Sequence, residues 1–272
     1  MIKLIASDLD GTLLKNGAQS LEPRTIDVIK RLTEKGIIFV ASSGRQYANL
    51  RRLFAPICED IAYICENGCL SFYEDRKIHK ETMTRELGEE LLHAIWEKDT
   101  AEILLSGEHT SYLQPKKESY LIHIRDVVKN NVTCVDDIFS VKEEYFKISV
   151  YEENGIGDSA YYWHRRFDKK ATVVTSGNVW LDFMPTGVDK GLAMGKLQSY
   201  LGIAPEECMA FGDNYNDLEM LASVKYNYVM NTAPEEIRST THYITSQVED
   251  VLECLLADGE DGLQRIKNKL SP

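Results

Sequence analysis

The sequence lacks the cysteine and histidine patterns of the common zinc and redox sites. No two of its six cysteines form a CxxC pair, Cys65 and Cys69 have no matching second pair, and its six histidines form no HExxH motif. We therefore expect buried free thiols in a reducing, cytoplasmic location rather than a zinc site or a disulfide framework. The segment Asn154-Gly155-Ile156-Gly157 lacks the third glycine of a dinucleotide-binding fingerprint and indicates a turn.

Positive charge and long hydrophobic runs are also scarce. The 43 acidic residues exceed the 31 basic ones and give a formal net charge of -12, which repels a phosphate backbone, so we expect no nucleic-acid partner. The first apolar run reaches Asp8 before it is long enough for a signal peptide, and no later run approaches a bilayer-spanning helix, so we expect no membrane partner. The remaining composition is that of a globular protein, with 43% hydrophobic and 27% charged residues.

Five short apolar runs are each followed by a helical pattern. Continuous hydrophobicity is typical of strands that are buried on both faces of a parallel sheet. The alternation with helices predicts an α/β fold, a Rossmann-like open parallel sheet with its chemistry at the carboxyl ends of the strands. We expect Ser20 to cap the first helix, Pro23 to lie early in it and Gly36 to end it. The predicted strands are residues 2–7, 37–42, 61–65, 208–211 and 226–230.

Residues 84–185 have a different pattern, which predicts an α+β insert. The chain would rejoin the sheet domain through Met184-Pro185-Thr186-Gly187, where proline and glycine indicate a hinge. We therefore expect a core domain made of residues 1–83 and 186–272. Within the insert the predicted elements are a helix around 87–95, a hairpin from 102–107 and 111–114, a helix at 118–128, a strand at 146–152, a helix at 160–167, and strands at 172–175 and 179–183.

Two aspartates follow the first predicted strand. Side chains two apart on a strand point to the same side, and Gly11 lets the backbone turn close to them, so Asp8 and Asp10 would converge. Two such carboxylates repel each other unless a cation lies between them, which indicates a metal ion. An ordinary acidic turn is the alternative. A helix-loop-helix calcium site fits less well, because Leu13 and Gln19 stand where it needs glycine and glutamate.

Two further segments place residues suited to phosphate at predicted strand ends or helix starts. In Ser42-Ser43-Gly44-Arg45, a hydroxyl and free backbone N–H groups suit phosphate oxygens, although an ordinary serine cap has the same pattern. In Asp189-Lys190-Gly191, we expect Asp189 to cap the next helix. Lys190 then offers a positive charge to an anion, and a solvated lysine is the alternative.

A last acidic segment, residues 211–217, follows the predicted strand at 208–211. Asp213 is placed to complete a hard oxygen site, and Asn216 and Asp217 begin the next helix; a tight acidic turn is the alternative. Together with Asp8 and Asp10, these acids could not all stay ionised in one site. A divalent ion and a nearby lysine would remove most of that conflict.

The four motifs, in this order, resemble the haloacid dehalogenase superfamily, in particular its Cof-type sugar-phosphatase branch. The resemblance covers nearly the whole chain, and it makes the insert at residues 84–185 a substrate-specificity cap. Ser42-Ser43 departs from the Ala-Thr of many relatives but keeps the hydroxyl. The matches are Asp8-Leu9-Asp10-Gly11-Thr12 for the first motif, Ser43 for the second, Lys190 for the third, Gly212-Asp213 with Asn216-Asp217 for the fourth, and Glu66-Asn67-Gly68 in support.

The resemblance implies phosphoryl transfer in two steps through an aspartyl-phosphate. Asp8 would be the nucleophile, and Asp10 would protonate the leaving group and then activate water. It also implies Mg2+ held by Asp8, the backbone carbonyl of Asp10, and Asp213. The other candidates bind or orient phosphate or substrate: Ser43 and Lys190 on the phosphate oxygens, Asp217 beside Lys190, and Gly44, Arg45, Asn67 and Asn216.

The function that follows is a magnesium-dependent phosphatase for a small phosphorylated metabolite, with a sugar phosphate as the first candidate. A phosphotransferase or phosphomutase of the same superfamily is one alternative, because it shares the aspartyl-phosphate and differs in the acceptor. A non-catalytic regulator that binds a phosphometabolite is another, although the intact Asp8 and Asp10 argue against it. The sequence singles out neither the cap residues that select the substrate nor an oligomeric state.

Overall fold

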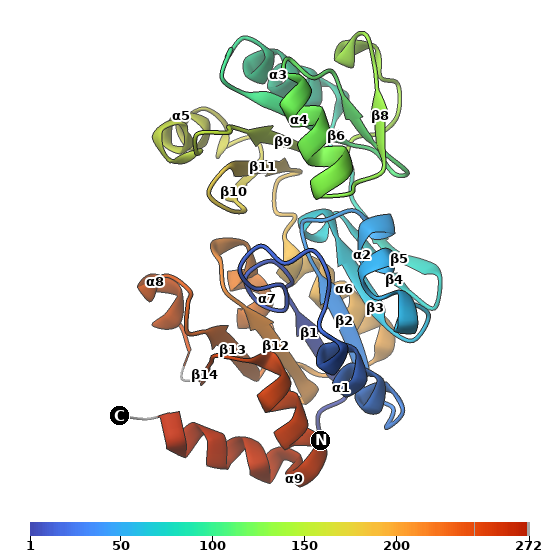
Figure 1. The fold of residues 1–272 in the computed structure, drawn as a ribbon, viewed down its shortest axis with the longest axis vertical. Helices are drawn as coiled ribbons and strands as arrows, with labels where there is room; N and C mark the ends of the chain where they lie inside the picture. Colours follow the sequence, from blue (N-terminus) through green and yellow to red (C-terminus); the bar gives the residue numbers. More distant parts are fainter. Residues whose placement is uncertain (242, 271–272) are drawn as a thin grey trace.

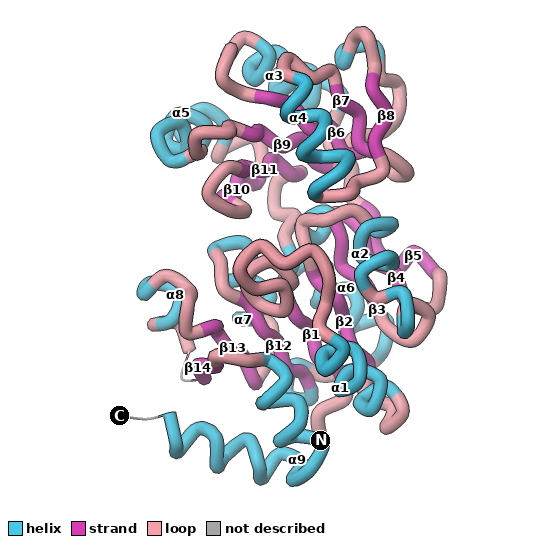
Figure 2. The backbone as a smooth tube through the Cα atoms, viewed as in Figure 1, coloured by secondary structure: helices cyan, strands magenta, loops and turns pink. Residues whose placement is uncertain are grey.

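Two β-sheets, each with its own helices, lie one beyond the other along the long axis of the molecule (Figure 1). The computed structural model describes residues 1–241 and 243–270, so residues 271–272 of the predicted core domain lie outside it. The first sheet is built from both ends of the chain and the second from its middle, and Figure 2 shows them as two groups of magenta strands. The predicted α/β fold is confirmed; the exact domain boundaries stay a prediction.

The core sheet contains all five strands that were predicted for it. Its order is β14-β13-β12-β1-β2-β3-β4-β5, parallel from β14 to β3 and antiparallel in the β3-β4-β5 pairs. Strands β4, β5 and β14 were not predicted. They lie toward the two edges of the sheet and lack a long apolar run. The bounds are β1 (Leu4–Ser7), β2 (Ile38–Ser42), β3 (Ala62–Cys65), β4 (Leu70–Tyr73), β5 (Arg76–Lys80), β12 (Cys208–Gly212), β13 (Tyr226–Met230) and β14 (Tyr243–Thr245).

Helices cover both faces of the core sheet, which explains why its central strands are apolar throughout. Alternate side chains point to opposite faces. Ile5 and Phe39 pack on one side of the sheet, and Leu4 and Val40 pack on the other. The first side is covered by α1 (Pro23–Thr33), α2 (Tyr47–Leu53) and α9 (Val248–Leu270), and the second by α6 (Lys190–Leu201), α7 (Leu218–Ala222) and α8 (Glu235–Arg238).

Helix α1 begins without the predicted cap. Ser20 lies before the helix, and Glu22 occupies the N-cap position with no side-chain hydrogen bond, so the prediction for Ser20 is wrong. Pro23 at the start of the helix has no N–H that needs a partner, and its φ is already helical, which lowers the need for a cap. The helix ends at Thr33, and Gly36 follows with a φ of 82°.

The second sheet carries the elements predicted for the insert, with two differences. Its order is β10-β11-β9-β6-β7-β8, and every pair is antiparallel except β7-β8. Strand β8 was not predicted because it is short and mostly exposed. The predicted helix at 118–128 changes into a π-helical turn at His123–Val127. The bounds are α3 (Arg85–Trp96), β6 (Glu102–Ser106), β7 (Ser111–Leu113), α4 (Glu118–Ile122), β8 (Val132–Cys134), β9 (Lys147–Tyr151), α5 (Gly157–Phe167), β10 (Thr172–Thr175) and β11 (Trp180–Met184).

The sheet of the insert has one apolar face and one polar face. In β9, Ile148 and Val150 belong to the apolar cluster under α3 and α5. Lys147 and Ser149 alternate with them and therefore point to the opposite face. Ser149 is the cross-strand partner of Asp182 in β11, so the polar face continues onto the neighbouring strand.

The six cysteines are free thiols, as expected. Cys65, Cys69 and Cys208 are buried. Cys134 is exposed because it lies in β8 at the edge of the second sheet, and Cys58 and Cys254 are only partly buried. The expectation of burial is therefore wrong for these three residues. Within residues 1–241 and 243–270, no helix is both long enough and apolar enough to cross a bilayer.

Candidate active site

The carboxyl ends of three neighbouring core strands bring the predicted motifs together. The strands lie in the order β12-β1-β2, and Asp213, Asp8 and Ser43 follow them in turn. Contacts between distant parts of the chain confirm the arrangement. The Thr12 hydroxyl donates a hydrogen bond of 2.9 Å to Asp213 Oδ1, across 201 residues of sequence.

Three carboxylates lie close together at this edge, and two of them bind one buried lysine. Lys190 is 0% exposed, and its Nζ donates to Asp8 Oδ1 and to Asp217 Oδ1, both at 2.6 Å. One oxygen from each of Asp8, Asp213 and Asp217 lies within 4.8 Å of the others. The alternative of a solvated lysine is therefore wrong. Asp189 caps α6 as expected, accepting from the Leu192 N–H at 2.7 Å.

The charges of this cluster do not balance. Burial raises the pKa of Asp8 well above its ordinary value, and the charge of Asp217 adds to this effect against that of Lys190. Burial also raises the pKa of Asp213 to about 6, again with a contribution from Asp217. For Lys190, burial alone would lower the pKa, but Asp217 and Asp8 outweigh it and raise the pKa. One ammonium beside three acids leaves an excess of negative charge that a divalent cation would neutralise.

The donor set fits Mg2+, which prefers carboxylate and carbonyl oxygens. Asp217 is already engaged: its Oδ1 accepts from Lys190, and its Oδ2 accepts from the backbone N–H groups of Asp213 and Asn214 at 3.0 and 3.1 Å. Asp217 therefore suits the predicted orienting role. Asp8 and Asp213 remain as the carboxylates most able to hold a cation.

Gly11 is needed for this arrangement. Its φ of 97° lies in the left-handed region, and a Cβ at this position would stand 2.1 Å from Asp213 Oδ2. The turn after β1 can therefore approach the fourth motif only when residue 11 has no side chain.

Asp10 and Arg45 form a bidentate ion pair that the sequence did not predict. Arg45 Nε donates to Asp10 Oδ2 at 2.8 Å, and its second nitrogen contacts Oδ1 at 2.6 Å. The Arg45 side chain is 10% exposed and that of Asp10 is 54% exposed. The guanidinium is therefore largely buried and lines a cavity beside the more exposed Asp10.

The turn after β2 carries the second motif. Ser43 is not a helix cap, because α2 begins at Tyr47 with Gln46 in the N-cap position. The Ser43 hydroxyl oxygen accepts from the Arg45 N–H at 3.2 Å, and its carbonyl accepts from the Asn67 N–H at 3.1 Å. Asn67 in turn accepts from Asn216 Nδ2 at 3.1 Å. These contacts connect the second and fourth motifs.

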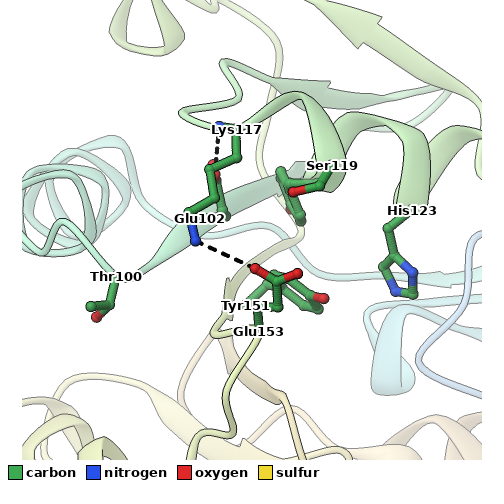
Figure 3. Close-up of a pocket in the computed structure, with 8 residues that line it drawn as sticks. Thr100, Glu102, Lys117, Ser119, His123, Tyr151 and Glu153 are labelled. Carbon is green, nitrogen blue, oxygen red and sulfur yellow. Dashed lines mark hydrogen bonds and ion pairs between the residues drawn. The ribbon is translucent and has the colours of Figure 1, made fainter.

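A cavity of about 340 Å³ lies between this edge and the polar face of the second sheet. The predicted residues that line it are Asp8, Asp10, Ser43, Gly44, Arg45 and Asn216. The insert contributes Leu104, His123, Val128, Lys147, Trp180 and Asp182 among others. A second cavity of about 130 Å³ lies within the insert, where Figure 3 shows Glu102, Lys117 and His123 around it. His123 lines both cavities.

The sequence analysis missed Thr12 and three residues of the insert: Lys147, Trp180 and Asp182. Thr12 was part of the first motif but received no role. For Lys147 a signal was present, because Lys147 and Ser149 alternate with apolar residues in a predicted strand and mark a polar face. Some partners of that face, such as Gly44 and Glu66, lie in the core, so the strand pattern alone could not identify them.

Comparisons with known proteins agree with this geometry. A family model described as haloacid dehalogenase-like hydrolase matches residues 5–254. The chain belongs to this family. As a member, it is similar to 5-amino-6-(5-phospho-D-ribitylamino)uracil phosphatase YbjI of Escherichia coli (strain K12), with 26% identity over 243 residues, 89% of this chain and 90% of the relative.

Solved structures share the fold. SMU.1108c from Streptococcus mutans UA159 has a TM-score of 0.85 and 28% identity, covering 95% of this chain and 100% of the other. The sugar phosphatase BT4131, of subclass IIB, has a TM-score of 0.77 at 22% identity, covering 98% of each chain, which shows the shared fold. The predicted haloacid dehalogenase family is confirmed, and its Cof-type branch stays a prediction. The protein is accordingly a phosphatase of the phosphoric monoester hydrolase class.

Proposed function

We propose that this protein is a magnesium-dependent phosphomonoesterase that works through an aspartyl-phosphate on Asp8. The observation that carries the proposal is the cluster of Asp8, Asp213 and Asp217, in which the buried Lys190 binds Asp8 and Asp217 and Asp8 lines the cavity of about 340 Å³. Phosphoryl transfer depends mainly on positioning and charge neutralisation, and this cluster offers both.

In the first step, a carboxylate oxygen of Asp8 attacks phosphorus. Lys190 donates a hydrogen bond to Oδ1 of Asp8. The other oxygen, Oδ2, does not bind Lys190 and is the one that attacks. The new O–P bond forms as the bond to the leaving oxygen breaks, and Asp10 gives that oxygen a proton. In the second step, Asp10 takes a proton from water, which attacks phosphorus and releases inorganic phosphate from Asp8.

Arg45 also takes part in this reaction. Its guanidinium pairs with Asp10, and the same bidentate fork suits two phosphate oxygens. A phosphate that enters the cavity competes for Arg45 and leaves the Asp10 carboxyl able to carry its proton. Ser43 and Gly44 lie on the same turn and line the cavity beside it.

Mg2+ would be held by Asp8, Asp213 and the backbone carbonyl of Asp10. When bound, it supplies positive charge between the Asp8 carboxylate and the incoming phosphate. Thr12 supports this role because its hydrogen bond fixes the Asp213 carboxylate.

The substrate we propose is a small phosphorylated metabolite, with a sugar phosphate as the first candidate. A cavity of about 340 Å³ suits a small organic leaving group. The relative YbjI is named for a phosphorylated ribitylaminouracil, so esters with a ring in the leaving group belong in the panel as well. We propose that the cap at residues 84–185 selects the substrate. The buried free thiols suit a reducing compartment, and we keep the cytoplasm as the proposed location.

The test is release of inorganic phosphate from a chromogenic phosphomonoester and a panel of phosphorylated metabolites, with and without Mg2+. Steady release that requires Mg2+ supports the phosphatase. Transfer of phosphate to an added sugar without net release would replace it with the phosphotransferase or phosphomutase alternative. Binding of a phosphometabolite without any turnover would leave the non-catalytic regulator.

A further inference from the structure

Three charged side chains are buried between the two sheets. Lys147 of β9 and Asp182 of β11 come from the cap, and Glu66 follows β3 of the core; their exposed fractions are 5%, 3% and 2%. Burial alone would lower the pKa of Lys147, but Asp182 and Glu66 outweigh it and raise the pKa, so the lysine stays charged. Buried charges are costly unless they are paired and hydrogen-bonded, so the partners of this Lys147 cluster indicate what it holds in place.

The ammonium of Lys147 reaches from the cap to the turn after β2. Its Nζ donates to the backbone carbonyl of Gly44 at 2.6 Å and lies 2.9 Å from Glu66 Oε2. Gly44 stands between Ser43 and Arg45, the two residues of this turn that are placed to bind phosphate. A lysine of the cap therefore fixes the backbone of the core's phosphate-binding turn.

The carboxylate of Asp182 holds a second part of the same site. Its Oδ2 accepts from Asn67 Nδ2 at 2.6 Å and from the Ser176 hydroxyl at 2.7 Å, and its Oδ1 accepts from Ser149. Asn67 in turn accepts from Asn216 of the fourth motif. The cap is thus joined to the second and fourth motifs by separate hydrogen bonds.

The core segment that receives these contacts has an unusual backbone. Glu66 and Asn67 are consecutive residues with φ of 50° and 54°, in the left-handed region that residues other than glycine rarely adopt. Ser106 of the cap also donates to Glu66 Oε2 at 3.0 Å. Such a backbone persists where its surroundings hold it, and here three strands of the cap do so.

We propose that Lys147 and Asp182 are positioning residues, through which the docked cap holds residues 43–45 and Asn67 in the arrangement that binds phosphate. The inference rests on the proposed function, because it concerns the same phosphate site. Neither side chain needs to touch the leaving group in this role. Loss of either one should therefore weaken the turnover of every phosphoester by a similar factor, whereas loss of a residue that contacts the leaving group affects only some esters.

The first test compares Lys147→Met with the parent on p-nitrophenyl phosphate and on esters with larger leaving groups. We expect kcat/KM to fall by about 100-fold on all of them, because small displacements of a positioned group have effects of this size. Lys147→Arg keeps the charge and should recover part of the loss. Affinity for inorganic phosphate, measured by calorimetry, should fall as well. Lys117→Met is the matched control, because Lys117 is an exposed cap lysine that lines the smaller cavity.

A second variant keeps the test decisive if Lys147→Met does not fold. Asp182→Asn preserves shape and removes the charge, and Glu152→Gln is its control at another buried acid of the cap, bonded to Ser159. Thermal unfolding identifies the folded variants. Parent-like kcat/KM and phosphate affinity in a folded variant would overturn the inference, as would a loss confined to large leaving groups. If the parent itself releases no phosphate, the proposed function fails, and the comparison of phosphate affinities still decides this inference.

Discussion

Lys190 arranges the acids of the site, because one ammonium binds Asp8 on one side and Asp217 on the other. Its motif could be found in the sequence, since Asp189 and Lys190 stand at a recognisable helix start. Its burial could not, because that depends on how α6 packs against the sheet. The ion pair between Asp10 and Arg45 could not be predicted from the sequence either, because it depends on the relative placement of two loops.

The variant Asp8→Asn tests whether Asp8 is the nucleophile. The amide keeps the shape of the side chain but cannot attack phosphorus, so kcat should fall by at least about 10³-fold. Burial and the charge of Asp217 disfavour the ionised form of Asp8, so we expect the variant to fold with an unchanged or higher melting temperature. Phosphate release, thermal unfolding and mass spectrometry of the phosphorylated enzyme measure the three effects. Asp99→Asn, at an exposed cap residue, is the control; turnover like the parent's in Asp8→Asn would refute the assignment.

At the scale of elements, the buried strands were predictable because each combines an apolar run with a following helix. The elements that were missed depend on other causes. β5 has a largely polar sequence and β8 is only three residues long, so neither has the apolar run by which the other strands were recognised. Ser20 was a reasonable cap by residue type, but Pro23 allows the helix to begin without one. The four motifs were predictable for a related reason, since three of them follow a strand that could itself be recognised and the third motif stands at a recognisable helix start.

The turn after β1 gives a test of metal binding with a matched pair of variants. Gly11→Ala and Gly17→Ala both place alanine at a positive φ, 97° and 74°. Gly17→Ala should lose about 1 kcal/mol of stability, and Gly11→Ala should lose more, because its Cβ also meets a neighbouring side chain. Only Gly11→Ala would push against the Asp213 carboxylate. It should need at least about tenfold more Mg2+ for half-maximal activity, as expected when a ligand's support is disturbed.

Mg2+ titrations of activity and of melting temperature measure both effects. EDTA should abolish the activity of the parent, and added Mg2+ should restore it. Equal Mg2+ requirements in the two alanine variants would argue against Asp213 as a metal ligand.

The loop after β6 gives a pH-dependent test of the contact between cap and core. Glu108 pairs with Lys77 and Lys80 of β5, and their hydrogen bonds lower its pKa from 4.5 to about 2. Since the pKa in the folded protein is depressed, this contribution is present above pH 4.5 and is lost as pH falls toward 2. Glu108→Gln should reduce the free energy of unfolding at pH 7 by less than about 1 kcal/mol, because the pairs are partly exposed.

Denaturant unfolding of the parent and of Glu108→Gln from pH 7 to pH 3 measures this difference, which should narrow as the pH falls. Glu97→Gln, at an exposed acid after α3, is the control. A difference that stays constant or grows toward low pH would contradict the assignment of the ion pairs.

At the scale of the whole molecule, the site depends on the placement of one sheet against the other. The two sheets lie one beyond the other (Figure 1). The cavity of about 340 Å³ is lined by residues of the core and by residues of the second sheet. An insert could be predicted from its change of pattern. The contacts of Lys147 and Asp182 could not, because they cross between two units that the sequence describes separately.

Trp180 tests whether the cap selects the substrate. It is half-buried in the cavity wall, with Tyr151 at 4.8 Å between ring centroids. Trp180→Ala should lower kcat/KM by at least about tenfold for esters with a large leaving group, because apolar contact is lost. A small ester such as p-nitrophenyl phosphate should lose much less. Trp96→Ala, a cap tryptophan on α3, is the control, and an equal loss on all esters would contradict a selecting role for Trp180.

The position of β1 at the centre of the core sheet affects how the protein is made. One of its two neighbours is β12, and Leu4 is paired with Cys208, so this edge of β1 stays open until most of the chain has left the ribosome. The second sheet pairs only strands between residues 102 and 184 and can complete its pairing earlier. We expect the nascent chain to expose the apolar edge of β1 throughout that interval, and a chaperone that shields such edges to raise the yield of folded enzyme.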